Sequence, residues 1–385
     1  QIMKENHREY QICTRCMMDT SDPWISFNDK GECNHCVDFM DVRIQLVSID
    51  NKNKYNSKIL SELVENIKIK AKNSKYDCVI GLSGGVDSSY TAYIAVKHGL
   101  RVLGVHLDNG WNSPVAVKNI NNITSNLGID YVTYIPPWNE FREVQLAFLE
   151  ASVPEAETPT DIAILKAIYS YAAKENVPFV ISGGNISGEG ILPVCWHYNA
   201  RDTKYSYSIL ESTGHQKNIY SSIKYGFFDE FYHLMIKRIK TYHLLNYISY
   251  DKNEARKFLI TELGWEDYYI KHGESRYTKF IQTYYLYVKH NIDYRRATLS
   301  SELCLRLTDR ESALELLSEL PYDDAEINHE IDYVAKKFNI TRQRLENIIN
   351  APPKWYVDYD NNMRTLGAIY DVYRKVYGKK KATNF

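Results

Sequence analysis

The stretch that most constrains the fold is residues 81–89, with the sequence GLSGGVDSS. A short apolar run, residues 77–80, comes before it, and residues 90–98 after it carry apolar side chains at helical spacing. The pattern predicts a glycine turn between a buried strand and a helix. Adjacent glycines let a backbone approach a ligand closely, and a helix start presents free N–H groups and a positive dipole end. We therefore predict an anion site here, with phosphate as the favoured anion.

Asp87 is the unusual residue of this turn, because a carboxylate repels phosphate unless a cation bridges the two groups. Mg²⁺ forms such bridges, so Asp87 is expected to bind Mg²⁺. The turn lacks the Gly-Lys-Ser/Thr ending of a Walker A loop, which indicates a different phosphate loop. A glycine turn that binds nothing is the alternative. The expected phosphate ligands are Ser83, Gly84, Gly85, Val86, Asp87, Ser88 and Ser89.

Residues 76–195 alternate between strand and helix patterns, with strands predicted over 78–82, 102–107, 131–135 and 179–181 and helices between them. Such alternation predicts an α/β fold with a doubly wound parallel sheet, in which ligands bind at the carboxyl ends of the strands. Asp108 and Asp161 are predicted to face this edge, although a loop or helix cap is the alternative for each. The expected nucleotide contacts at the strand ends are Leu107, Asp108, Gly183, Gly184 and Asn185.

Residues 1–40 are expected to form a separate zinc-binding unit. Two Cys-x-x-Cys pairs lie close together in the sequence, and two such knuckles complete a tetrahedral site of four thiolates. A closed site of this kind predicts a structural role. Disulfides, which a cytoplasmic chain disfavours, and iron are the alternatives. The predicted ligands are Cys13, Cys16, Cys33 and Cys36.

The remaining chain divides into a predicted linker helix, residues 41–75, and a mainly helical region, residues 196–385, for substrate or partner binding. Cations, acids and aromatic side chains gather in residues 265–280 and 293–297. Arginine in such a cluster suits a bidentate grip on phosphate or carboxylate, although a solvated helix face with ion pairs is the alternative. The formal net charge of −1 argues against a nucleic-acid partner, and the absence of a long apolar run predicts a soluble, cytoplasmic protein without a membrane partner.

The Cys-x-x-Cys pairs followed by residues 83–88 resemble two groups of PP-loop ATPases, which split ATP between its α and β phosphates. One group is the N-acetyl sugar amidotransferases of surface-polysaccharide biosynthesis, of the WbpG, WbuX and PseA type. The other is the tRNA 2-thiolation enzymes. Residues 262–280, 295–301 and 308–314 look like the downstream blocks of the sugar group. This resemblance implies a HUP-like PP-loop domain over 76–195.

The resemblance also implies a reaction, in which ATP adenylates an acetamido oxygen of a nucleotide sugar and ammonia displaces AMP. A UDP-diacetamido uronic acid is the favoured substrate, and the acetamidino product serves O-antigen and lipopolysaccharide biosynthesis. ATP, Mg²⁺ and Zn²⁺ are the implied cofactors. Catalytic roles are expected for Asp87, Ser83, Lys279 and Glu189, and substrate contacts for Asp161, Glu274, Arg276, Arg295 and Arg296. Glu189 and Glu274 are expected to hold sugar hydroxyls or the attacking nitrogen.

The nitrogen source is predicted to lie outside this chain, because no glutaminase Cys–His pair is identifiable in it. The family implies a glutaminase and a cyclase-like partner of the histidine-biosynthesis type. Two other functions compete with this interpretation. tRNA thiolation requires a cysteine near the crevice, for which Cys195 is the candidate. A non-catalytic ATP-binding regulatory module is the third hypothesis.

Overall fold

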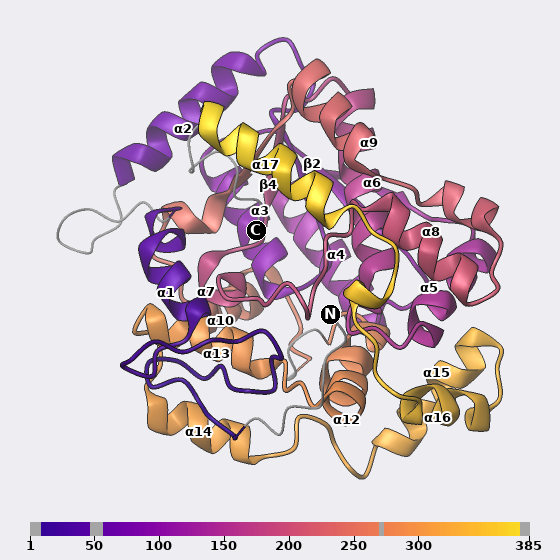
Figure 1. Ribbon diagram of the computed structural model, residues 1–385. Coiled ribbons are helices and arrows are strands. Elements are labelled where there is room, and N and C mark those ends of the chain that lie inside the picture. The colour runs from indigo at the N-terminus through magenta and orange to yellow at the C-terminus, as the bar shows by residue number, and fades with distance from the viewer. Residues whose placement is uncertain (1–8, 47–56, 269–272, 378–385) are drawn as a thin grey trace.

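The computed structural model describes residues 9–46, 57–268 and 273–377, and its centre is a five-stranded parallel sheet (Figure 1). The strand order is β3-β2-β1-β4-β5, so the chain winds outward in both directions from β1. The predicted doubly wound sheet is confirmed. The strands are β1 (Cys78–Gly81), β2 (Val102–Leu107), β3 (Asp130–Tyr134), β4 (Phe179–Ser182) and β5 (Lys240–His243).

Helices cover both faces of the sheet, because alternate residues of the central strand are buried on opposite sides. Cys78 and Ile80 belong to the apolar core shared with α2, α3, α4 and α10, whereas Val79 belongs to the core shared with α5 and α6. A strand buried on both faces needs such a continuous apolar run. These helices are α2 (Ser57–Lys70), α3 (Val86–Lys97), α4 (Pro114–Leu127), α5 (Trp138–Glu150), α6 (Thr158–Lys174) and α10 (Lys252–Leu263).

Four of the five strands lie within a residue or two of their predicted positions, but β5 was not predicted. Its sequence, Lys-Thr-Tyr-His, lacks an apolar run, and it occupies the edge of the sheet beside β4. An edge strand has one neighbour and is only half covered, so its sequence carries a weaker pattern. Gly99 follows the end of α3 and Gly264 follows the end of α10, and both have positive φ values.

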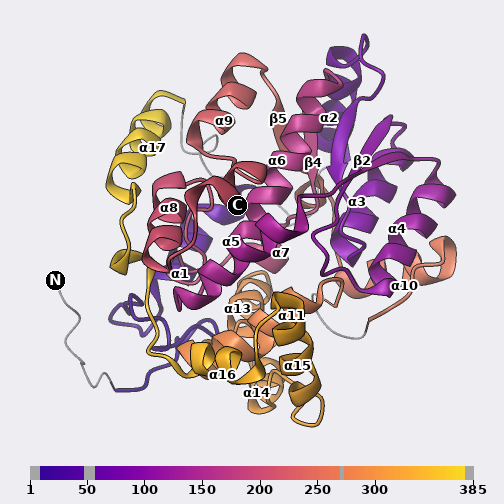
Figure 2. The same ribbon diagram turned by 90° about the vertical axis from the view of Figure 1, so that its right-hand side faces the viewer.

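The rest of the chain is mostly helical, as predicted, and α11 to α16 lie below the sheet (Figure 2). No helix in the described ranges is long and apolar enough to cross a membrane. The helices of this region and of the N-terminal unit are α1 (Asn34–Asp41), α7 (Ile186–Glu189), α8 (Thr203–Ser212), α9 (Phe227–Phe231), α11 (Arg276–Phe280), α12 (Leu286–His290), α13 (Arg295–Cys304), α14 (Arg310–Ser318), α15 (Ile327–Phe338), α16 (Arg342–Asn350) and α17 (Met363–Tyr377).

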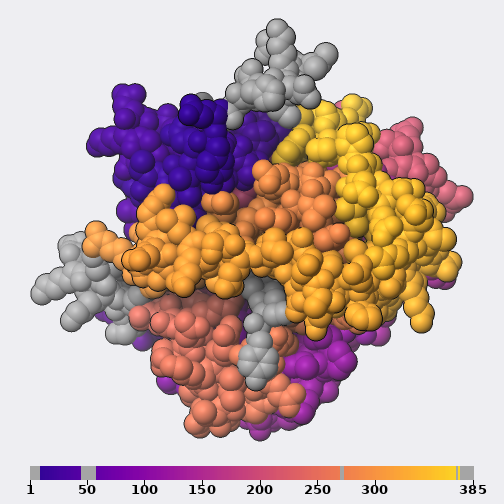
Figure 3. Space-filling model, turned by 90° about the horizontal axis from the view of Figure 1, so that it is seen from below, coloured from indigo at the N-terminus to yellow at the C-terminus, as the bar shows by residue number. Residues whose placement is uncertain are grey.

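The N-terminal unit packs beside the α13–α14 segment, as the adjoining indigo and orange surfaces show (Figure 3). The Met17 N–H donates to Ser300 Oγ at 3.0 Å, and the Arg310 guanidinium donates to the Cys16 carbonyl at 2.9 Å. Arg296 reaches the Met17 carbonyl at 2.8 Å and Asp19 at 3.1 Å. Segments nearly 300 residues apart in the sequence are therefore joined by hydrogen bonds.

Glu155 is a buried acid that makes stability depend on pH. Its side chain is 2 % exposed, it accepts a hydrogen bond from the Tyr205 hydroxyl, and burial raises its pKa from 4.5 to about 7. Between these pH values the folded chain keeps the proton that the unfolded chain releases. Stability therefore falls as pH rises through this window, by about 3 kcal/mol in all.

We expect Glu155→Gln to remove this pH-dependent loss, because glutamine has no proton to release. We compare the free energy of unfolding of the variant with that of the wild-type protein at each pH. This difference should favour the variant by about 2–3 kcal/mol more at pH 8 than at pH 4.5. Urea unfolding at the two pH values measures this difference. An effect of Glu155→Gln that is the same at both pH values would contradict the assignment.

Candidate active site and metal site

The glycine turn lies between β1 and α3, where it lines a cleft at the carboxyl edge of the sheet. Gly84 has φ +82°, and a Cβ on it would lie 2.6 Å from the Ala116 carbonyl oxygen. Ser83 Oγ accepts the Gly85 N–H at 3.1 Å and lies 3.1 Å from Ser88 Oγ. Hydroxyl groups thus hold the turn beside the cleft. The cleft is lined by Ser83, Gly85, Val86, Asp87, Ser88, Lys252, Arg256, Trp265, Asp267, Tyr268 and Glu274.

We expect Gly84→Ala to destabilise the protein by about 2 kcal/mol or more and to weaken ATP binding at least tenfold. The new methyl group adds left-handed strain and a clash with the Ala116 carbonyl, which displaces the turn. Gly214→Ala is the matched control, because Gly214 has φ +77° and nothing within 4 Å of its Cβ position. Thermal melting and ATP titration measure both effects. Equal effects of the two substitutions would show that close packing at Gly84 is unimportant.

Asp87 is positioned by Tyr250, which precedes α10, and by Lys252, the first residue of α10. Tyr250 donates its hydroxyl hydrogen to Asp87 Oδ1, and Lys252 Nζ lies 3.2 Å from Asp87 Oδ2. The Asp87 side chain is 32 % exposed and lines the cleft, so a cation in the cleft can reach it. A carboxylate at the start of a helix, beside backbone N–H groups, suits Mg²⁺ bound together with phosphate.

Positive charge enters the cleft from α10 and not from the residues predicted in the sequence. Arg256 lines the cleft with Lys252, and its Nε has no hydrogen-bond partner among the described residues. Arg256 Nε lies 3.6 Å from an Asp267 oxygen. Trp265 Nε1 and the Tyr268 hydroxyl both donate to the Gly84 carbonyl, the former at 2.8 Å. Sequence reasoning noted residues 265–268 as a dense stretch but did not assign Tyr250, Lys252 or Arg256, which carry no motif.

The other strand-end glycines lie beside the same turn. A Cβ on Gly183 would approach Ser88 N to 3.0 Å, and one on Gly184 would approach Glu189 Oε2 to 2.9 Å. The Asn185 carboxamide oxygen is used to cap α7, where it accepts the Gly188 N–H at 2.9 Å. Glycine at these two positions therefore permits close packing at the crevice.

Of the predicted nucleotide contacts, Asp108 has a local role in the structure and Ser89 is buried. Asp108 follows Leu107 at the end of β2, and its carboxylate accepts the Gly110 N–H at 3.0 Å. Ser89 lies in α3 with 2 % of its surface exposed, and it is not among the residues that line the cleft. Contacts of Leu107, Asp108 and Ser89 with a nucleotide stay predictions.

The cations predicted for the site do not line the cleft beside the glycine turn; they are the catalytic candidate Lys279 and the substrate candidates Arg276, Arg295 and Arg296. Arg276 pairs with Glu330 at 3.0 Å, and Lys279 Nζ is 4.0 Å from Glu326 in a separate small cleft. Arg295 pairs with Asp293 at 2.6 Å and also donates to two backbone carbonyls. Arg296 connects α13 to the N-terminal unit. Their predicted contacts with substrate stay predictions, and each already has an acidic partner within the chain.

Of the predicted acids, Glu274 and Glu189 lie beside glycines of the crevice, and Asp161 lies at the start of α6. A Cβ on Gly85 would lie 3.3 Å from Glu274 Oε1, and the Glu274 carbonyl accepts the Ser113 N–H at 2.8 Å. Asp161 lies in the first turn of α6, where its Oδ2 is 3.7 Å from His197 Nε2. Glu274 and Glu189 thus lie beside glycines of the crevice, and Glu274 shares the lining of the cleft with Lys252 and Arg256.

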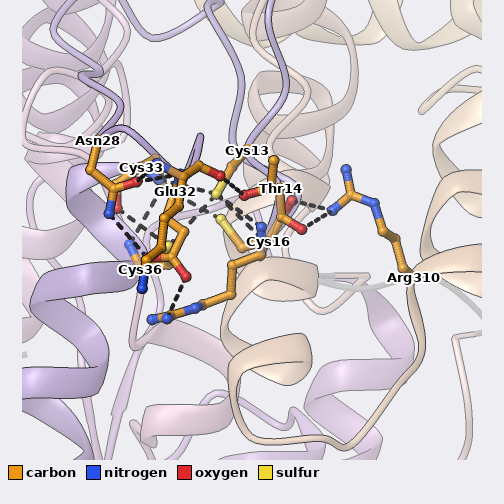
Figure 4. Close-up of polar contacts among 10 residues, drawn as sticks. Cys13, Thr14, Cys16, Asn28, Glu32, Cys33, Cys36 and Arg310 are labelled. Atoms are coloured by element: carbon orange, nitrogen blue, oxygen red, sulfur yellow. Dashed lines mark hydrogen bonds and ion pairs between the residues drawn. The ribbon is translucent and has the colours of Figure 1, made fainter.

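The four predicted ligand cysteines form one buried cluster (Figure 4). Their Sγ atoms all lie within 4.8 Å of one another, with 3.6 Å between Cys13 and Cys36 and 3.5 Å between Cys16 and Cys33. A tetrahedral ion with bonds of about 2.3 Å places its sulfurs about 3.8 Å apart. The Cys33 N–H donates to Cys13 Sγ at 3.1 Å, which favours a thiolate. The cluster is compatible with zinc, and the described cysteines form no disulfide.

The cysteine proposed for sulfur transfer is inaccessible. Cys195 is 4 % exposed, donates to Asp22 at 3.1 Å, and has a pKa raised mainly by burial. Cys78 is fully buried in β1, and every free cysteine among the described residues is buried. A thiol that transfers sulfur is expected to be partly exposed and to have a lowered pKa. Neither cysteine meets these conditions.

Comparison with known proteins identifies first the class and then the family. The NAD synthase family matches residues 59–188, which contain the sheet and the glycine turn, so the chain has a PP-loop ATP-using domain. The C-terminal domain of WbpG-like LPS biosynthesis proteins matches residues 274–377. Together the two matches confirm the resemblance to WbpG-type PP-loop proteins that the sequence predicted.

Individual relatives share only parts of the chain. An NH3-dependent NAD+ synthetase of Methanocaldococcus jannaschii is 43% identical to this chain over 56 residues. The matched segment is 14% of this chain and 22% of that protein. The solved structure of the NH3-dependent NAD synthetase of Campylobacter jejuni is 18% identical, with a TM-score of 0.29. The match covers 54% of this chain and 93% of the synthetase chain. The U34-tRNA thiolase NcsA of Methanococcus maripaludis is 13% identical, with a TM-score of 0.33. That match covers 69% of this chain and 82% of the thiolase chain. These structural likenesses are too low to carry an argument.

Proposed function

We propose that this protein converts an acetamido group of a nucleotide sugar to an acetamidino group, using ATP and ammonia. The observation that carries the proposal is that residues from the two matched regions line one cleft. The PP-loop supplies Asp87, and the WbpG-like domain, which begins at residue 274, supplies Glu274 to the same cleft. The substrate we favour is a UDP-diacetamido uronic acid, and the product would serve O-antigen biosynthesis.

In the proposed reaction, the amide oxygen of the acetamido group attacks the α-phosphate of ATP and pyrophosphate leaves. The amide oxygen is a poor leaving group, and the new phosphate ester makes it a good one. Ammonia then forms a C–N bond, the C–O bond to AMP breaks, and one proton passes to solvent. Mg²⁺ held by Asp87 would neutralise charge on the departing pyrophosphate. The Lys252 and Arg256 side chains would stabilise the same charge.

The ammonia would come from a partner glutaminase acting with a cyclase-like protein. This part of the proposal is supported by the family resemblance. The four cysteines would hold zinc in a structural role, because a site with four thiolates leaves no open coordination position. The hydrogen bonds that join this unit to α13 and α14 are consistent with a structural role.

The test is mass spectrometry of a reaction with ATP, Mg²⁺, ammonium and a panel of UDP-linked diacetamido sugars and uronic acids. Replacement of O by NH lowers the substrate mass by about one dalton, and AMP with pyrophosphate should form in equal amounts. The shift should disappear without ammonium. ADP as the nucleotide product, or no change in any sugar of the panel, would contradict the proposal, and ATP use stimulated by tRNA would favour thiolation.

A further inference from the structure

Both carboxylate oxygens of Asp87 are engaged by donors from one neighbouring segment. Oδ1 accepts a hydrogen bond from the Tyr250 hydroxyl, and Oδ2 lies 3.2 Å from Lys252 Nζ. Burial and then the charge of Asp87 raise the pKa of Tyr250, so this hydroxyl stays neutral and remains a donor. Lys252 is therefore the partner that balances the charge of Asp87, and Tyr250 is the partner that fixes its orientation.

A divalent metal ion at Asp87 would use the same carboxylate oxygens. Mg²⁺ binds its oxygen ligands at about 2.1 Å, and its charge has the same sign as that of a lysine ammonium group. With Lys252 Nζ 3.2 Å from Oδ2, a metal ion on that oxygen would lie beside a second positive charge in a partly buried cleft. Tight binding of metal at Asp87 therefore requires the ammonium group to leave Oδ2.

The Lys252 side chain can make this move while α10 stays in place. The Phe258 ring packs on Tyr93 of α3 with 4.3 Å between ring centroids, which fixes α10 against the helix that carries Asp87. The Lys252 side chain is 37 % exposed and lines the cleft together with Ser83 and Ser88 of the glycine turn. A lysine side chain has a flexible four-carbon stem, so its ammonium group can turn from Asp87 toward the glycine turn.

We propose that Lys252 keeps divalent metal off Asp87 until a triphosphate enters the cleft and gives the ammonium group a new partner. The proposal rests on the proposed function for the use of ATP with Mg²⁺. Phosphate oxygens beside the glycine turn attract the Lys252 ammonium group, and Oδ2 of Asp87 becomes accessible to the metal. Tyr250 stays on Oδ1 and holds the carboxylate in position. Metal and triphosphate therefore bind to this cleft cooperatively.

The first test measures metal binding to the full chain without nucleotide. The probe is Mn²⁺, which favours carboxylate oxygens over thiolates, and electron paramagnetic resonance counts the ions left in solution. Lys252→Met should bind Mn²⁺ about tenfold or more tightly than the wild-type protein, because a positive charge beside the ligand oxygen is lost. Adding Asp87→Asn to Lys252→Met should abolish this gain. Equal Mn²⁺ affinity of the wild-type protein and Lys252→Met would overturn the proposal.

The second test measures ATP binding by calorimetry in the presence of Mg²⁺. Lys252→Met should bind ATP about tenfold or more weakly, because the triphosphate loses the ammonium group that moves to it. The same substitution is thus expected to strengthen metal binding and to weaken nucleotide binding. A lysine that only stabilised the fold would not change the two affinities in opposite directions. Tighter Mn²⁺ binding with unchanged ATP affinity would overturn the exchange of partners.

Lys257→Met is the matched control on the same helix. Lys257 is 72 % exposed and pairs with Glu254 at 3.0 Å, so this substitution removes the same charge from α10 outside the cleft. It should leave both affinities within about twofold of wild type, since exposed charges are screened. Equal effects of Lys257→Met and Lys252→Met would overturn the proposal. Neither test uses sugar or ammonia, so the result stands even if the proposed amidine formation fails.

Discussion

The substitution Asp87→Asn is expected to lower pyrophosphate formation from ATP by roughly 10²–10³-fold. Asparagine keeps the shape of the side chain and an oxygen that can accept from Tyr250, but it removes the charge that would hold Mg²⁺ beside the departing pyrophosphate. The loss should be in the rate of the chemical step more than in folding, because the Asp87 side chain is 32 % exposed. Pyrophosphate release measured in saturating ATP and Mg²⁺ checks this expectation.

Asp251→Asn is the matched control for Asp87→Asn. Asp251 caps α10, where its carboxylate accepts the N–H groups of Asn253 at 2.8 Å and Glu254 at 3.0 Å, and asparagine caps helices about equally well. The control should keep its pyrophosphate formation and its melting temperature. If Asp87→Asn retained more than a tenth of wild-type activity, Asp87 would not be the Mg²⁺ ligand.

The substitution Cys16→Ser is expected to remove the metal from the N-terminal unit and to lower the melting temperature by roughly 10 °C. Loss of one thiolate opens the closed site, and structural zinc contributes its binding free energy to folding. The damage should spread to α14, because Arg310 binds the Cys16 carbonyl. Metal analysis of the purified protein and thermal melting measure the two effects, with about one zinc ion per wild-type chain expected.

Cys304→Ala is the control for the metal prediction. Cys304 is a buried cysteine of α13 that lies outside the four-cysteine cluster. This variant should keep its metal and lose only the stability that a small cavity costs, about 1 kcal/mol. Iron in place of zinc, or a Cys16→Ser protein that keeps its metal and its melting temperature, would contradict the expected zinc site.

The local features of this protein were predictable because their signals lie close together in the sequence. The apolar run before residues 81–89 and the helical spacing after them define the strand, the turn and α3. The two Cys-x-x-Cys pairs likewise lie within 24 residues, and the structure brings all four thiols together. In both cases residues close together in the sequence determine the local geometry. Residue pattern and spacing were therefore sufficient to predict the turn and the cysteine cluster.

Residues brought to the cleft from far along the chain were not predictable. Tyr250 and Lys252 reach Asp87 across more than 160 residues, and Glu157 meets Thr278 across more than 120. No periodicity connects such positions, because their contact depends on how α6, α10 and α11 pack around the sheet. Composition indicated a cationic substrate site at Arg295 and Arg296, but in the structure Asp293 and Asp19 pair with them.

The sequence by itself therefore determined the parallel sheet, the phosphate turn with Asp87, the four-cysteine cluster and the family. These follow from residue type and short-range spacing, which act on the backbone locally. Only the tertiary structure decided which charges share the crevice. It placed Lys252 and Arg256 in one cleft with Asp87 and Glu274, because long-range packing sets the distances between charges and hence their partners.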